Sequence, residues 1–193
     1  MFDSRSKRRG WIVTLGVLTA FLAVPTPASA QRSLFFEETA SAFWAVPFEC
    51  ADGSVVEGTL LVQTTRDFES PDTEDADPTA RVQFLSVCPD GTSFSWGGIV
   101  PATITSASNL KRVTASGSGI VRDILGGTHQ VSFDVTWTAV GPLVTTVNGP
   151  GSKRLQREAV ATGQVTFDGE VIVDGANDHP TRPAPFIRVD TEK

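Results

Sequence analysis

Histidine and cysteine are scarce in this sequence, which has two of each among 193 residues and no tyrosine. His129 and His179 stand far apart, so a histidine-based zinc centre is not expected. Two cysteines hold a metal only with further ligands, and neither histidine is close to Cys50 or Cys88 in the sequence. The sequence therefore predicts no metal site, and no motif in it indicates a cofactor.

Basic residues are also in the minority, with 16 Lys and Arg against 22 Asp and Glu. Four of the basic residues and one acid fall within residues 1–30, so the remainder carries 12 basic and 21 acidic residues, a net charge of −9. Such a surface repels phosphate backbones and anionic lipid headgroups. Nucleic acid is therefore not an expected partner.

The sequence has one long apolar run, at residues 11–24. Four basic residues precede it and Ala28-Ser29-Ala30 follows it, the arrangement of a cleavable signal peptide. Fourteen helical residues reach about 21 Å, short of the roughly 30 Å core of a bilayer. Residues 1–30 are therefore expected to be a signal peptide cleaved between Ala30 and Gln31. The product is expected to be secreted, extracellular or in the cell envelope, with no stable membrane anchor.

The first ten residues leave the export route open. Arg8-Arg9 is typical of twin-arginine export, but Lys7 stands where Ser or Thr is usual, which favours the Sec route. No cysteine lies near the cleavage site, so a lipid anchor on a new N-terminal cysteine is not expected.

Cys50 and Cys88 form an even pair, which in an oxidising compartment predicts a disulfide over free thiols or a metal site. Each begins a C-x-D-G-[ST] segment, which places the two thiols at comparable strand ends. A disulfide needs Cα atoms within about 7 Å, whereas alternate strands of a flat meander lie about 9.5 Å apart. The two strands are therefore neighbours, or face each other in a curled sheet, or the thiols lie in turns beyond them.

Period-two alternation dominates the chain after residue 42, and it is clearest at residues 130–139. One face of this segment carries Val131, Phe133, Val135, Trp137 and Ala139. Polar residues, including Asp134, occupy the other face. This pattern predicts a half-buried strand of an antiparallel sheet, with Trp137 in the core.

Seven further segments have a similar composition and join into one series of strands. They are residues 43–50, 54–65, 80–88, 92–105, 110–124, 155–167 and 170–174. The two-residue hairpin signals are Asp52-Gly53, Asp90-Gly91, Gly126-Gly127 and Asp168-Gly169. A sheet of about 8–10 strands must close or stack to hide its edges. Residues 31–174 are therefore expected to form one all-β domain, a single antiparallel β-barrel or a strongly coiled β-sandwich, and the long strands favour the barrel.

Three segments lie outside this pattern. Residues 33–42 fit a short helix or an N-terminal strand equally. Residues 66–79, with six acids and two prolines, are expected to be a solvated loop, with weak calcium binding as the alternative. Residues 147–151 are expected to be a connection, and residues 175–193 a Pro-rich polar C-terminal segment.

No catalytic residue is assigned by any motif. The small-residue stretch at 115–119 does not fit the G-x-S-x-G elbow, and is expected to be a strand or bulge that lets a backbone or ligand approach closely. Trp96 precedes two glycines and is expected to be exposed. It is the candidate ligand-binding residue, because exposed aromatic side chains of secreted β domains stack on sugars or line a ligand mouth.

Two segments, HQVSFDVTWTAVGP at 129–142 and AVATGQVTFDG at 159–169, resemble a pattern in other sequences. The pattern is that of uncharacterised exported bacterial proteins with a V-x-x-T-W-T-x-x-G-P strand and a later A-T-G-x-V-T-x-D-G hairpin. The resemblance covers roughly the last third of the chain. It implies a secreted β domain and brings no functional residues with it.

Three functions fit these observations. The leading hypothesis is a secreted non-catalytic β domain that binds a small molecule, a glycan or a cell-envelope partner. The second is a β-barrel hydrolase or lyase with a carboxylate-lined cavity, and the third is a structural envelope or matrix protein. An apolar cavity favours the first hypothesis, a pair of buried acids the second, and a solidly packed core the third.

Overall fold

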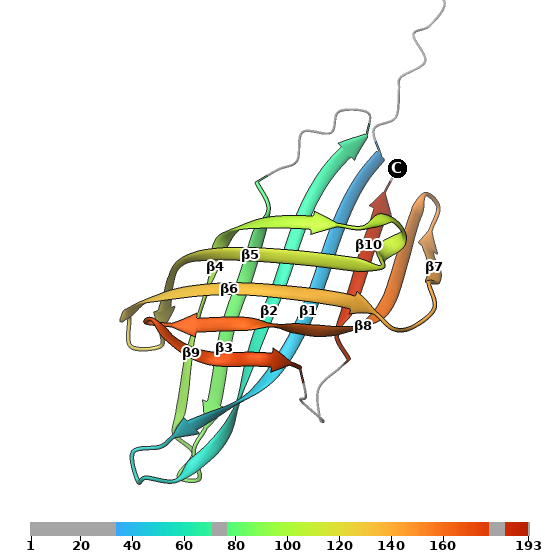
Figure 1. Ribbon diagram of the computed structural model, residues 1–193. Helices are drawn as coiled ribbons and strands as arrows, with labels where there is room; N and C mark the ends of the chain where they lie inside the picture. Colours follow the sequence, from blue (N-terminus) through green and yellow to red (C-terminus); the bar gives the residue numbers. More distant parts are fainter. Residues whose placement is uncertain (1–33, 71–76, 178–183, 193) are drawn as a thin grey trace, which may run out of the picture. The chain divides into compact units, whose positions relative to one another are not determined.

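Eight antiparallel strands close into a barrel in the computed structural model, which describes residues 34–70, 77–177 and 184–192 (Figure 1). In barrel order they are β1 (Leu34–Glu49), β2 (Val55–Ser70), β3 (Thr79–Val87), β4 (Ser93–Ser106), β5 (Arg112–Asp123), β6 (Thr128–Ala139), β8 (Ser152–Phe167) and β10 (Phe186–Glu192). Closure is made by β10, which pairs with β1 on one side and with β8 on the other. The all-β class is confirmed, and the closed ladder makes the fold a barrel and not a sandwich.

Strand β8 is long enough to have four partners. Its first half pairs with β10 on one side and with β7 (Val144–Gly149) on the other. Its second half pairs with β6 and with β9 (Glu170–Ala176). Among the described strands, β7 and β9 pair only with β8, so they lie outside the closed barrel. A single 3-10 turn, Ser108–Leu110, joins β4 to β5.

Strand β4 changes partner along its length. Its first nine residues pair with β3, while Trp96, Gly97 and its last five residues pair with β5. Between the pairs Gly97–Arg122 and Ala102–Gly117 the ladder to β5 is interrupted, and Pro101, which has no N–H to donate, lies in this interval. A Cβ at Gly117 would overlap the carbonyl oxygen of Pro101. The small-residue stretch of β5 is therefore part of a strand, and it allows the close approach that its composition predicts.

The barrel interior is filled by two large rings set among small side chains. Trp44 and Trp137 are 2% and 0% exposed. The alanines that face the same interior are Ala40, Ala42, Ala80, Ala115, Ala159 and Ala161, all buried. An eight-stranded barrel is only wide enough for side chains to fill, and the pairing of Trp137 with Ala161 shows how a large residue is matched by a small one.

The alternation predicted for residues 130–139 is confirmed. In β6, Val131, Phe133, Val135 and Trp137 are all buried, while Asp134 is exposed. Residues 34–42 form the first part of β1, so the segment that fitted either a helix or a strand is a strand wherever it is described.

Three expectations about segments between or after the strands are wrong. Strand β2 continues to Ser70, so the acidic loop begins later than residue 66; residues 71–76 lie outside the described part. Residues 144–149 form β7 instead of running as a connection from 147. The barrel also does not end at residue 174, because β10 supplies its closing strand. The prolines of residues 175–185 predicted an irregular segment to the end of the chain, but the strand β10 follows them.

Candidate functional site

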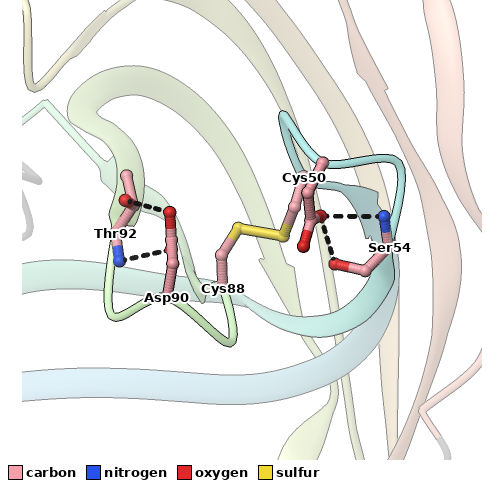
Figure 2. The surroundings of a disulfide bond; sticks show 6 residues. Cys50, Ser54, Cys88, Asp90 and Thr92 are labelled. Carbon is pink, nitrogen blue, oxygen red and sulfur yellow. Dashed lines mark hydrogen bonds between the residues drawn. A yellow bond between two sulfur atoms is a disulfide. The ribbon is translucent and has the colours of Figure 1, made fainter.

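Four hairpin turns gather at one end of the barrel, after β1, β3, β5 and β8, and we call this the disulfide end. Cys50 and Cys88 lie in the first two turns, with their Cα atoms 6.0 Å apart in a disulfide bond (Figure 2). Strands β1 and β3 both pair with β2 and not with each other. The predicted bond is therefore confirmed, and of the three arrangements open to it the thiols adopt the last, in turns beyond the strands.

The two cysteine turns have the same hydrogen bonds, which explains the recurring C-x-D-G-[ST] segment. In each, the cysteine amide donates to the carbonyl of the residue four positions on, at 2.8 Å. The aspartate two positions after the cysteine accepts a hydrogen bond from the backbone amide of the following Ser54 or Thr92 (Figure 2). The glycines between them, Gly53 and Gly91, have φ of 81° and 86°, a conformation that glycine adopts at little cost.

An apolar pocket of about 140 Å³ opens at the disulfide end. Its lining residues are Val46, Pro47, Phe48, Phe84, Phe94, Trp96, Phe167 and Ile172. They come from β1, β3, β4, β8 and β9, so the pocket exists only when the barrel is closed. We call it the mouth pocket. Ile172 reaches it from a β-bulge in β9, where the register with β8 shifts by one residue.

The rings of the mouth pocket form a continuous row of contacts. Phe167 stacks on Trp96 at 4.5 Å between centroids, and Trp96 stacks on Phe84 at 5.7 Å. Phe84 continues to Phe48 at 5.8 Å, and Phe48 stacks on Phe94 at 5.1 Å. Offset aromatic pairs at these separations are attractive beyond the area they bury. The row therefore holds the walls of the pocket in place.

His129 ties two of the turns together beside this row. Its Nδ1 lies 2.8 Å from Asp168 Oδ2 and its Nε2 lies 3.1 Å from Asp123 Oδ2, while its ring stacks on Phe167 at 4.6 Å. The hydrogen bond to Asp168, followed by that to Asp123, raises the pKa of His129. The hydrogen bond from His129 is also the main cause that lowers the pKa of each carboxylate. The β5–β6 and β8–β9 turns are thus joined by the His129 imidazole, which lies between two carboxylates; we call this contact the His129 clamp.

The opposite end of the barrel contains a buried carboxylate. Glu38 is 4% exposed, accepts a hydrogen bond from Ser106 Oγ at 2.6 Å, and pairs with the Arg66 guanidinium at 2.8 Å. Among the described residues it is the only buried acidic side chain. The pair of acids that glycoside hydrolysis requires is therefore not assembled in the described interior.

The structure places the residues chosen from sequence as follows. Trp96 is 4% exposed, so the expectation that it is exposed is wrong, although its ring does line the mouth pocket. Trp137 is in the core as predicted. His179, the segment 71–76 and the cleavage site at Ala30 and Gln31 lie outside the described residues.

Sequence reasoning missed the phenylalanines of the mouth pocket and the partners of His129. Phe48, Phe94 and Phe167 lie at or near the ends of their strands, next to a turn signal. That shared position was the one available sign that they meet at one end of the barrel. His129 is the second residue of its strand, beside a hairpin turn, and its partner Asp168 belongs to another turn signal.

Comparison with known proteins adds no assignment: no family model, curated protein or solved structure matches the chain. The described residues contain no group of three or more His, Cys, Asp or Glu placed to hold a metal ion. No helix long and apolar enough to cross a membrane occurs in the part of the chain that the structure describes.

Proposed function

We propose that this is a secreted, non-catalytic binding domain that receives an apolar group of an extracellular small molecule, glycan or envelope partner in the mouth pocket. The observation that carries the proposal is an open pocket walled by aromatic and aliphatic side chains at the end of a barrel whose interior is filled. A dry engineered cavity of about 150 Å³ takes up benzene. The mouth pocket, at about 140 Å³, is of a size for one ring or one branched alkyl group.

The filled interior supports a site at the end of the barrel over one in its lumen. Trp44 and Trp137 occupy the space where a larger barrel holds its ligand. A ligand of drug size needs roughly 300 Å³ or more, so only part of it would enter the mouth pocket. The remainder would lie across the surrounding turns.

The fixed walls also support binding. The disulfide joins the turns behind Phe48 and Phe94, and the His129 clamp joins the turns behind Phe167. A pocket whose walls are already ordered loses less entropy when a ligand binds.

The proposal is tested by fluorine NMR of protein labelled with 5-fluorotryptophan. Toluene serves as the probe because it matches the pocket in size and carries no charge. We expect the Trp96 signal to shift saturably with toluene, while the signals of Trp44 and Trp137 stay in place.

A pair of variants on β9 makes the test specific. Ile172→Phe should fill the mouth pocket and abolish the Trp96 shift, whereas Val171→Phe, at a neighbouring position that is 53% exposed, should leave it unchanged. A Trp96 shift that survives Ile172→Phe, or no shift in the wild-type protein, would overturn the proposal in favour of a structural envelope protein. An equal shift of all three indole signals would show non-specific uptake and have the same consequence.

A further inference from the structure

A second hollow, of about 410 Å³, lies on the outer wall of the barrel across β3, β4 and β5. We call it the arginine groove. The side chains that border it from outward-facing positions are Arg81, Gln83, Ser95, Ile99, Arg122 and Ile124. Its floor is formed by Gly97 and Gly98 of β4. The groove is distinct from the mouth pocket, and only Trp96 borders both.

The groove exists because one side chain is missing from an outward row. Gly97 is paired with Gln83 on β3 and with Arg122 on β5, so three positions lie side by side across the wall. A Cβ added at Gly97 would lie 3.2 Å from Gln83 Cγ, close to the neighbouring side chain. The interruption of the β4–β5 ladder begins just beyond this row. The glycine therefore leaves a flat floor between two longer side chains.

Both arginines of the groove lack a carboxylate partner among the described residues. Other arginines do have such partners: Arg154 and Arg188 each form an ion pair with Asp190, and Arg66 forms one with Glu38. By contrast, the cross-strand neighbours of Arg81 are Gln63 and Ile99. Those of Arg122 are Gly97 and Thr128. Two guanidinium groups without a carboxylate partner in the described part of the chain thus border one hollow, in a protein of net charge −6.

One acidic residue, Asp123, also lines the groove, and its carboxylate is already occupied. Asp123 accepts hydrogen bonds from the amides of Leu125 and Gly127, at 2.8 and 2.7 Å, in addition to its contact with His129. Its carboxylate caps the β5–β6 turn and is held by those three groups. The guanidinium groups therefore remain available to an anion from outside the chain.

We propose that the arginine groove binds an acidic saccharide, with its uronate carboxylate between Arg81 and Arg122. Arginine recognises carboxylates through paired, charge-assisted hydrogen bonds. The amide of Gln83 and the hydroxyl of Ser95 suit sugar hydroxyl groups. Ile99 and Ile124, which are 63% and 59% exposed, offer apolar surface to the C–H faces of a pyranose ring over the glycine floor.

The strand arrangement favours a saccharide over an acidic peptide. Peptides commonly bind to sheets by adding a strand to a free edge. Strands β3, β4 and β5 each have a partner strand on both sides, and the β4–β5 ladder is interrupted only between Gly97 and Ala102, so the groove presents no free strand edge of this kind. A pyranose ring that lies on a flat floor does not need a free strand edge. This site is separate from the mouth pocket, and neither proposal depends on the other.

The test is calorimetric titration with trigalacturonate at low salt, with neutral galactotriose and hexaglutamate as comparison ligands. We expect Arg81→Gln and Arg122→Gln each to weaken trigalacturonate binding by about tenfold or more, the loss of one charge-assisted hydrogen bond. Gly97→Val, which fills the floor without changing charge, should weaken it as well. Arg112→Gln is the matched control, because Arg112 lies at the opposite end of β5 on the same outward face. It should leave the affinity within about twofold.

Each other outcome overturns the proposal. Equal losses with Arg112→Gln and Arg122→Gln would show general attraction of an anion to positive charge. Hexaglutamate binding with the same arginine dependence would assign the groove to an acidic peptide instead. Equal affinity for galactotriose would remove the arginines from recognition, and no binding of trigalacturonate by the folded wild-type protein would end the proposal. The mouth-pocket variant Ile172→Phe should have no effect on this titration, so failure of one site is distinguishable from failure of the other.

Discussion

Replacement of Trp137 tests how the barrel interior is filled. The indole is 0% exposed and faces β8 at Ala161 and β5 at Val113, neither of which is large enough to close the gap it would leave. Loss of a large buried aromatic side chain costs about 3–5 kcal/mol. We therefore expect Trp137→Ala to lower the free energy of unfolding by that amount.

Trp137→Phe is the more discriminating change. The Nε1–H of Trp137 is buried and has no hydrogen-bond partner among the described residues, a situation that costs about 1–3 kcal/mol. The smaller ring leaves part of the indole volume empty, which costs on the order of 1–2 kcal/mol. The two effects oppose each other, so the free energy of unfolding of Trp137→Phe should lie within about 1 kcal/mol of that of the wild-type protein.

Urea denaturation followed by circular dichroism measures both changes. Thr138→Ala, at the next and exposed position of β6, is the control and should lie within about 0.5 kcal/mol of wild type. A cost below about 1 kcal/mol for Trp137→Ala would refute the placement of the ring in the core. Equal costs for the alanine and phenylalanine variants would show that the indole N–H is satisfied in the folded protein.

Three further predictions concern the turns and the N-terminus. Replacing Cys50 and Cys88 together by serine should lower the free energy of unfolding by up to about 4 kcal/mol, the chain-entropy estimate for a closed loop of this length; two alkylatable thiols in the folded wild-type protein would contradict the bond. The His129 contact should stabilise the protein most between about pH 4 and 6.5. The pKa of His129 is raised in the folded protein, so its contribution is complete below the unfolded pKa near 6.5 and is lost as the pH rises through the folded pKa. The pKa values of Asp123 and Asp168 are lowered, so their contribution is lost only as the pH falls through those folded pKa values. Denaturation midpoints of the wild type and His129→Gln, measured from pH 4 to alkaline pH, should differ in the acid range and converge at alkaline pH. A difference that does not change with pH would contradict a role for the His129 contact. Intact mass of the exported protein should correspond to a chain that begins at Gln31, and a species retaining residues 1–30 would contradict secretion.

Local pattern was sufficient for the parts of the fold that depend on one hairpin. The alternation of β6 is strict because one of its faces is buried from Val131 to Trp137, and a shift by one residue would expose that face. The dipeptide Asp168-Gly169 predicted a turn because these residue types are common where a type I′ hairpin requires positive φ. In the structure both residues have positive φ, at 50° and 87°. Such signals are contained in a few consecutive residues.

Pairing between distant segments was not available from local pattern. Strand β10 alternates inward Ile187 and Val189 with outward Arg188 and Asp190, but its partners β1 and β8 are remote in sequence. Its short length and the preceding prolines gave no reason to include it in the barrel. The mouth pocket has the same origin, because its rings come from separate strands and meet only through the register of the closed sheet.

The error over Trp96 shows how composition misleads when alternation is ignored. The following glycines indicated an open, exposed site, but strand alternation places Trp96 inward together with Gly98 and Val100. Gly97, on the other face, is the residue that opens the surface, and it forms the floor of the arginine groove. The glycines therefore accompany a hollow on the outer face of the wall, whereas the tryptophan lies on its inner face.

The segments 129–142 and 159–169, which were expected from sequence to form a strand and a hairpin, pack directly against each other. Thr136 pairs with Thr162 and Trp137 with Ala161 in the β6–β8 ladder. A Cβ at Gly163 would overlap the backbone of Asp134 and the side chain of Val135. Trp137, Ala161 and Gly163 thus each have a packing reason for their residue type in this strand pair.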